Sequence, residues 1–178
     1  MSASPQDLMT AKLFFNAAFP TMQVLLDDDP KLHKKFQNFN ATVQFGAMND
    51  GELLCCHLIF QNGNLTVVQG PAEKSDISLT FSSVEKMNSL LKGGLSLPSI
   101  KGNLSLLPNV LSILMGLKIM TKPNDKLKND TEKLLKVKCS LYMITRALSQ
   151  YNKLGDPDMQ EFCRRQPDRI YQFTVADR

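Results

Sequence analysis

The chain has 178 residues, of which 43% are hydrophobic and 21% charged, and its formal net charge is +4 at neutral pH. This length fits one domain with a sizeable core, and the composition excludes an intrinsically disordered chain. The mild positive charge is interspersed with acids, as in Asp125–Lys138, so we expect no nucleic-acid partner. A weak contact with anionic membrane surfaces stays open.

Four cysteines, Cys55, Cys56, Cys139 and Cys163, show neither a CxxC pair nor the spacing of metal ligands. We expect all four to be reduced and to act as small apolar side chains, which favours a cytoplasmic location. The N-terminus has no basic region followed by an apolar core, so we expect no signal peptide. No metal ion and no cofactor is predicted.

The N-terminal part of the chain predicts helices. Ser4–Asp7 has the pattern of a capping box with proline at the first helical position. Pro20 is expected to break or kink the helix that follows, and Asp29-Pro30 begins a further short helix. The first helix shows one wide apolar face at helical spacing, made by Leu8, Ala11, Phe15, Ala18, Phe19 and Met22.

Alternation of apolar and polar residues predicts strands at 42–45, 53–61, 65–68, 77–81 and 100–104. Asn62-Gly63 is the strongest short-range signal for a hairpin between the second strand and the third. Gly102 is expected to weaken the fifth strand or to admit a close neighbour. Helices before and after an antiparallel meander predict an α+β domain with helices over one face of the sheet.

A short helix is predicted between the cap Ser82-Ser83 and the stop Gly93-Gly94. The last helix of this part begins at Pro108, and its residues are apolar on nearly every side. Such a helix must be covered on all sides by protein, membrane or ligand. Leu104–Met120 is slightly short for a membrane span and includes polar residues, so we interpret it as the core helix of a soluble domain.

A long helix is predicted after Pro123, and it carries a heptad seam made by Leu134, Val137, Leu141, Ile144, Leu148 and Tyr151. The seam is shorter than the ~3–4 heptads of a confident coiled coil. We therefore favour packing on its own domain over a homodimer through Leu134–Tyr151. Tyr171, Phe173 and Val175 alternate as a final strand. The predicted organisation is a domain at 1–122 and a helical extension at 123–178 that packs on it.

Four segments carry a resemblance to a known family, namely Thr42–Gly46, the hairpin His57–Gly70, Ser75–Ser83 and Ile100–Leu104. In order and spacing they resemble the sterol carrier protein type-2 family, over roughly Leu8 to Met120. The resemblance implies a five-stranded, mostly antiparallel sheet with helices over one face, enclosing an apolar tunnel for sterols, fatty acids or fatty acyl groups. The sequence departs from the family at Gly94–Ser99 and in residues 123–178.

The resemblance predicts a non-enzymatic lipid carrier. The apolar side chains expected to line its cavity are Phe15, Phe19, Met22, Phe45, Met87, Leu91, Leu107, Leu111, Leu114 and Met115. Taken singly, each of them is more simply a core residue. Unbranched methionine side chains suit variable apolar guests. Leu111 and Met115 lie one turn apart, so we expect both to contact the ligand.

Two other functions stay open. The first is an accessory module of the same fold that mediates protein interaction or dimerisation. The second is an enzyme, for which His33 and His57 are the only histidines. Strand parity puts His57 on the same face as Cys55, which makes a Cys–His pair conceivable. The sequence has neither a GxSxG motif nor a glycine-rich phosphate loop, so no catalytic residue is predicted.

Overall fold

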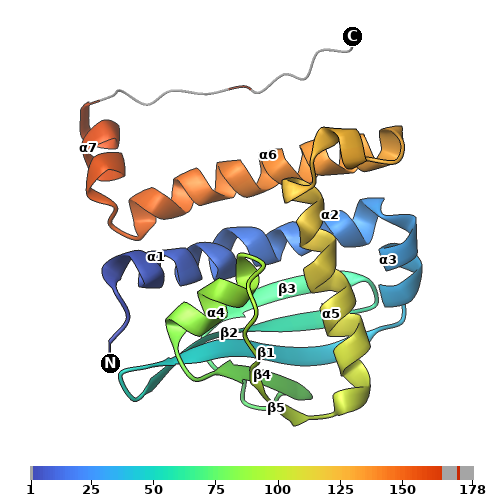
Figure 1. The fold of residues 1–178 in the computed structure, drawn as a ribbon, viewed down its shortest axis with the longest axis horizontal. Helices are drawn as coiled ribbons and strands as arrows, with labels where there is room; N and C mark the ends of the chain where they lie inside the picture. The colour runs from blue at the N-terminus through green and yellow to red at the C-terminus, as the bar shows by residue number, and fades with distance from the viewer. Residues whose placement is uncertain (1, 166–171, 173–178) are drawn as a thin grey trace.

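The computed structural model describes residues 2–165 and Gln172, and within them a five-stranded sheet forms one layer of the molecule (Figure 1). The order across the sheet is β3-β2-β1-β4-β5. The strands are β1 (Asn40–Asn49), β2 (Glu52–Gln61), β3 (Asn64–Gln69), β4 (Ile77–Phe81) and β5 (Ser99–Gly102). Neighbouring strands are antiparallel, except that β1 and β4 are parallel. The predicted α+β class with a mostly antiparallel, five-stranded sheet is confirmed.

The hairpin between β2 and β3 is built as its sequence predicts. Asn62 and Gly63 have φ angles of 50° and 83°, which is the geometry of a type I′ turn, and Gln61 pairs with Asn64 across it. Asp50 and Gly51 repeat this geometry between β1 and β2, with φ angles of 51° and 88°. These turns set the register of the first three strands.

The parallel pairing of β1 and β4 requires a crossover, which residues 70–76 supply. This segment crosses the sheet face away from the helices, where the Gly70 carbonyl accepts from His57 Nδ1 at 3.0 Å and the Gln44 side chain accepts from the Ala72 amide at 3.0 Å. The Asp76 amide then donates to the Thr42 carbonyl at 2.8 Å, which places β4 beside β1. The sequence predicts a simple meander instead, and in this respect the prediction is wrong.

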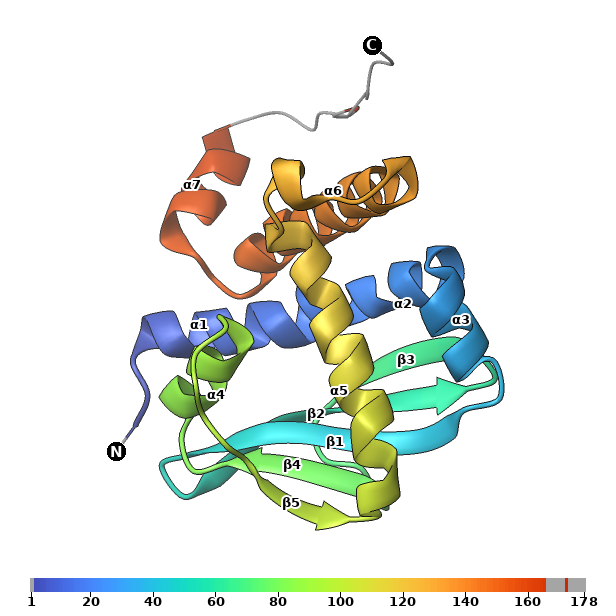
Figure 2. The ribbon, with the colours of Figure 1, turned by 45° about the vertical axis from the view of Figure 1, so that its right-hand side comes forward.

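Helices cover the other face of the sheet, as both ribbon views show (Figures 1 and 2). They are α1 (Pro5–Leu13), the π-helical turn η1 (Phe14–Ala18), α2 (Phe19–Asp28), α3 (Pro30–Phe36), α4 (Val84–Leu91) and α5 (Leu107–Gly116). Two further helices, α6 (Asp130–Lys153) and α7 (Pro157–Arg165), lie on the side of α1 and α2 that faces away from the sheet. Short 3₁₀ turns η2 (Leu104–Leu106), η3 (Leu117–Thr121) and η4 (Asn124–Lys126) flank α5 and precede α6.

Pro20 does not break the first helix. Because proline lacks an N–H, it cannot donate to the carbonyl of Asn16 four residues earlier. The backbone widens into η1 just before the proline, and Arg146 Nε of α6 donates to the Asn16 carbonyl at 3.3 Å. The chain therefore runs on from α1 into α2, and the freed carbonyl joins α6 to this helix.

The core lies between the sheet and the helices, and aromatic rings run through its centre. Phe19 of α2 contacts Phe15 and Phe45, with ring centroids 5.8 and 5.2 Å apart, and Phe45 contacts Phe81 at 5.5 Å. These four side chains are buried. Gly102 closes β5 with a φ of 99°, and a Cβ there would lie 2.3 Å from the Asp76 carbonyl oxygen. The predicted close approach at Gly102 is therefore confirmed.

α6 lies against α2, η1 and η3. Leu135 and Cys139 are its buried side chains. Lys138 Nζ pairs with Asp28 of α2 at 2.9 Å. The heptad seam predicted for this helix does not coincide with this buried side. Three of its residues, Leu134, Ile144 and Leu148, are exposed, and the other three are half-buried. The predicted strand of Tyr171, Phe173 and Val175 lies outside the described residues.

Candidate functional site

Five of the predicted cavity residues form the closed centre of the core. Phe15, Phe19, Met22, Phe45 and Met87 come from η1, α2, β1 and α4, and each is at most 1% exposed. The Phe15–Phe19 and Phe19–Phe45 ring contacts join three of them directly. In this state the five side chains pack against protein atoms, as core residues do.

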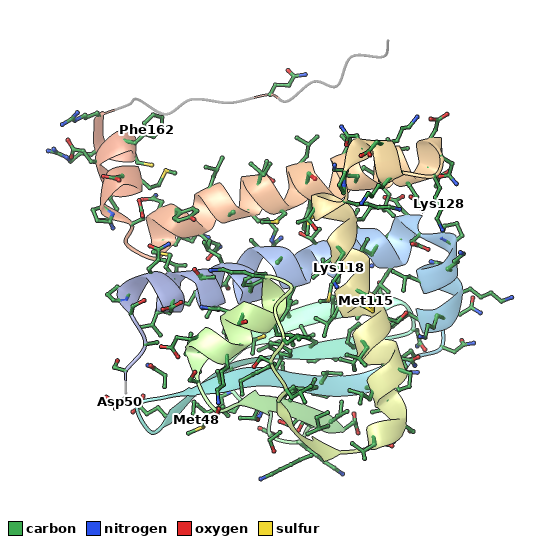
Figure 3. All side chains as sticks on the ribbon, viewed as in Figure 1. Met48, Asp50, Met115, Lys118, Lys128 and Phe162 are labelled. Atoms are coloured by element: carbon green, nitrogen blue, oxygen red, sulfur yellow. The ribbon has the colours of Figure 1, made fainter. Side chains whose placement is uncertain are left out.

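The other predicted cavity residues lie farther out. Leu91, Leu107 and Leu114 are half-buried and pack against the core. Leu111 and Met115 are 45% and 61% exposed, so they lie on the outer side of α5. Figure 3 labels Met115 on this helix. α5 is thus not the covered core helix that its composition indicates. Its buried side is formed by Val110 and Ile113, while the contact of Leu111 and Met115 with a ligand stays a prediction.

A pocket of about 750 Å³, open to solvent, lies beside α4. Its walls come from α4 and from the loop that joins α4 to β5, and they consist of Glu85, Lys86, Ser89, Leu90, Leu95, Ser96 and Leu97. Leu95 and Leu97 are fully exposed at its rim. The pocket therefore combines three leucines with a few polar groups.

The backbone holds this loop against α4. Ser83 caps the start of α4, where its Oγ accepts from the Lys86 amide at 3.4 Å. After the helix, the Gly94 amide donates to the Ser89 carbonyl at 2.8 Å. A Cβ at Gly94 would lie 2.4 Å from Ser89 Oγ and 3.0 Å from the Ser89 carbonyl oxygen, so glycine leaves room for the chain to turn closely on the helix. The helix boundaries predicted from the serine cap and the paired glycines are confirmed.

α4 itself is fixed by α1 (Figure 2). The buried Asn88 donates from Nδ2 to the Asp7 carbonyl at 3.0 Å and to its carboxylate at 3.2 Å. Hydrogen bonds from Ser4 and Asn88 hold the pKa of the Asp7 carboxyl below its usual value. One wall of the pocket therefore rests on a rigid support, while the other is a loop.

The three pocket leucines are not among the cavity residues predicted from the sequence. Leu90 directly precedes the predicted residue Leu91, and Leu95 and Leu97 lie in the segment where the sequence departs from the resembled family. The available signal is compositional. Two leucines alternate with glycine, serine and proline in GGLSLPS (93–99), where turn residues predict a surface loop. Leucines in such a loop have no core to face, so they predict an exposed apolar site.

The histidines take structural positions. His33 Nδ1 lies 2.9 Å from the Leu26 carbonyl, and His57 Nδ1 lies 3.0 Å from that of Gly70. Because a carbonyl only accepts, each ring donates from Nδ1 and holds a turn or the crossover. Among the residues that the structure describes, no hydrogen bond joins His57 to Cys55, and no three His, Cys, Asp or Glu side chains are arranged to hold a metal ion.

The surroundings of Cys55 and Cys56 on the sheet and of Cys139 on α6 make these thiols unreactive. Burial raises the pKa of the Cys55 and Cys56 thiols, and for Cys56 the neighbouring Cys55 adds to the rise. Burial also raises the pKa of Cys139 to about 11, with a further contribution from Asp28. At neutral pH these thiols stay protonated, and the protonated form is a poor nucleophile.

We expect a thiol-reactive disulfide reagent to modify one cysteine quickly in the native protein at neutral pH. That cysteine is Cys163, because it is exposed on α7 while the other three are buried. Absorbance of the released thiolate should show one fast equivalent and three that react only after denaturant is added. Cys163→Ser should abolish the fast phase. A second fast equivalent in the native protein would contradict the burial of the other three.

Comparisons with known proteins concern the fold. The sequence matches no protein-family model and no curated protein. A crystal structure of sterol carrier protein 2 is similar to this chain with a TM-score of 0.45 and 14% identity, over 58% of this chain and 96% of that chain. The solution structure of the sterol carrier protein domain 2 of Helicoverpa armigera is similar with a TM-score of 0.43 and 20% identity, over 66% of this chain and 94% of that chain. Both TM-scores are below 0.5 and both identities below 25%, so the likeness says nothing about the ligand or the activity of this chain.

Proposed function

We propose that the protein binds one long-chain lipid and carries it without catalysing a reaction. The observation that carries this proposal is the pocket beside α4, where Leu90, Leu95 and Leu97 line a volume of about 750 Å³. Ligand sites of ~300–1,000 Å³ with mostly apolar walls and a few polar groups are typical of small-molecule binding. The sequence resemblance between Leu8 and Met120 supports the same function.

An alkyl chain on these leucines would remove apolar surface that is now in water. A chain of ~16 carbons gives an upper limit near ~12 kcal/mol at ~0.8 kcal/mol per buried CH₂. The cost of immobilising the ligand, about 4 kcal/mol or more, lowers this limit to about 8 kcal/mol, which corresponds to micromolar affinity at best. Access of the same chain to Phe19 and Met87 would require the closed core to open, for which Met22 and Met87 have adaptable side chains.

Displacement of a fluorescent fatty-acyl probe tests the pocket. Ser96→Trp should fill it and weaken probe binding by about tenfold or more, because the indole takes the volume of the alkyl chain. Ser149→Trp, on the exposed side of α6, is the matched control and should leave binding unchanged. Both variants should keep the melting temperature of the wild type. Absence of any displaceable or extractable lipid in the wild type would overturn the proposal.

Leu111→Trp extends this test to α5. Leu111 is partly exposed, so the larger side chain has room and the melting temperature should stay unchanged. If probe binding falls in this variant, the ligand reaches the outer side of α5. If binding persists, the ligand stays at the α4 pocket and Leu111 is not part of the site.

A second candidate function is dimerisation through α6. The observation that favours it is the exposure of Leu134, Ile144 and Leu148, which share the predicted heptad seam. Light scattering of the wild type and of Ile144→Glu with Leu148→Glu tests it, since both positions are exposed and tolerate charge. A wild-type dimer that becomes a soluble monomer in the variant supports the interface. A monomeric wild type would contradict it.

A further inference from the structure

Exposed apolar side chains occupy two segments that follow each other in the chain. Leu95 and Leu97 are exposed on the loop after α4, and Leu104, Leu111 and Met115 are exposed on η2 and α5. Residues 104, 111 and 115 are seven and four apart, so they lie along one side of a helical segment. Both ribbon views draw the loop after α4 and α5 in front of the sheet, so both border the same side of the molecule (Figures 1 and 2). We call the five side chains the apolar ridge.

The segment that carries the ridge has lysines as its only charged residues, although Glu85, which directly precedes it, lines the pocket together with Leu95 and Leu97. Residues 86–124 contain Lys86, Lys92, Lys101, Lys118 and Lys122 and no aspartate or glutamate, although the whole chain holds 17 acids. Lys118 follows Met115 by one turn of helix (Figure 3).

Two lysines near α5 already have partners within the protein. Lys35 of α3 reaches the start of α5, where its Nζ donates to the Pro108 carbonyl at 3.1 Å. Lys122 is occupied by Glu132, 2.6 Å away. Within residues 2–165, Lys92, Lys101 and Lys118 form no ion pair. Lys118, one turn after Met115, and Lys86, in the pocket wall beside Leu95 and Leu97, border the ridge. Lys92 instead lies near the Asp7 carboxylate, and Lys101, which pairs with Ser78, lies on the sheet face away from the helices.

We propose that the apolar ridge docks on the surface of an anionic phospholipid bilayer. Leucine and methionine side chains enter the boundary between headgroups and acyl chains, and the lysines lie at the level of the negative headgroups. A second copy of this chain fits the surface less well, because a symmetric contact would bring these lysines against the same lysines of the other copy. The charge pattern therefore favours a lipid surface over a dimer.

The segment lies on the bilayer and does not cross it. Leu104–Thr121 has a mean hydropathy of 1.6 over 18 residues, which by length and composition is enough for a membrane span. However, Val110, Ile113 and Leu117 are buried in the protein core, and the helical segment is interrupted by 3₁₀ turns. Only its outer side is free to meet lipid, as in interfacial helices.

This proposal stands without the proposed lipid cargo, because a bilayer can bind the ridge while the pocket is empty. The two sites share Leu95 and Leu97, which line the pocket and belong to the ridge. Docking would therefore bring the pocket rim to the lipid surface.

Flotation of the full chain with vesicles tests the docking surface. The protein should float with vesicles of equal parts phosphatidylcholine and phosphatidylserine, and stay behind with phosphatidylcholine alone. Salt should weaken the binding, since it screens exposed charges. Leu95→Ser with Leu97→Ser should lower the vesicle affinity by about tenfold or more, and Lys86→Gln with Lys118→Gln should do the same.

Matched pairs serve as controls. Leu134→Ser with Leu148→Ser removes exposed leucines from α6, and Lys74→Gln with Lys153→Gln removes exposed lysines from the crossover and the end of α6. Neither pair should change the vesicle affinity. All four variants change exposed residues, so their melting temperatures should match the wild type.

Three results would overturn the proposal. The first is absence of binding to the mixed vesicles, and the second is an equal loss in the control pairs. The third is a wild-type dimer that Leu95→Ser with Leu97→Ser converts to a monomer in light scattering, because it would assign the ridge to a second copy. The vesicle assay reads the ridge and the probe assay reads the pocket, so failure of one proposal is separable from failure of the other.

Discussion

Phe19→Ala is expected to lower the free energy of unfolding by about 3–5 kcal/mol, the usual range for deleting a buried aromatic ring. Phe19 is fully buried, and its ring contacts those of Phe15 and Phe45. Urea denaturation followed by circular dichroism measures the change. Phe162→Ala removes a half-exposed ring from α7 and should change stability by no more than ~0.5 kcal/mol.

The size of this loss reports on what Phe19 packs against. In a closed core, the missing ring leaves a cavity that the surroundings fill only in part. At the wall of an empty tunnel, the ring has fewer neighbours and its removal costs less. A loss below ~1 kcal/mol would contradict the packed centre formed by the aromatic rings.

Gly102→Val is expected to lower the free energy of unfolding by about 2–4 kcal/mol, from backbone strain and steric overlap together. The φ of 99° at this position disfavours any side chain, and the added Cβ would meet the Asp76 backbone at 2.3 Å. The overlap would separate β5 from β4 at the point where the chain turns toward α5. Thermal and urea unfolding monitor the effect.

Gly155→Val is the matched control for Gly102→Val. Gly155 has a similar φ of 84°, but the nearest atom to an added Cβ is the Gln160 side-chain nitrogen at 3.9 Å. This variant should show the strain without the overlap, and hence the smaller loss. Equal losses in the two variants would show that the contact with Asp76 contributes nothing.

The parts of the fold that could be predicted from the sequence rest on local chemistry. Asn62-Gly63 favours a type I′ turn by its own backbone preferences. Ser83 caps α4 by accepting a hydrogen bond from Lys86, only three residues later in the sequence. The parallel placement of β4 has a different origin. It depends on contacts of residues 70–76 with Gln44 and His57, which lie far away in the sequence. Local patterns carry no information about such contacts.

The sequence indicates which segments near the candidate site are apolar, but it does not indicate which of their side chains are exposed. An apolar pattern shows that α5 must be covered, but it does not show by what. On α6, Leu135 and Cys139 are buried, whereas Leu134, the residue just before Leu135, is exposed. Apolar residues thus lie on two adjoining faces of this helix, and the heptad pattern alone does not indicate which face packs on the domain. Leu95 and Leu97 lie in a loop, where the period of a helix or a strand gives no guide.

Native mass spectrometry of the purified full chain tests the central claim most directly. We expect a species heavier than the chain by the mass of one lipid, which collisional activation removes and organic extraction recovers. Incubation of delipidated protein with a long-chain fatty acid should restore the heavier species with one equivalent bound, and Ser96→Trp should prevent this. A chain that carries no lipid when purified and takes up none when incubated would contradict the account.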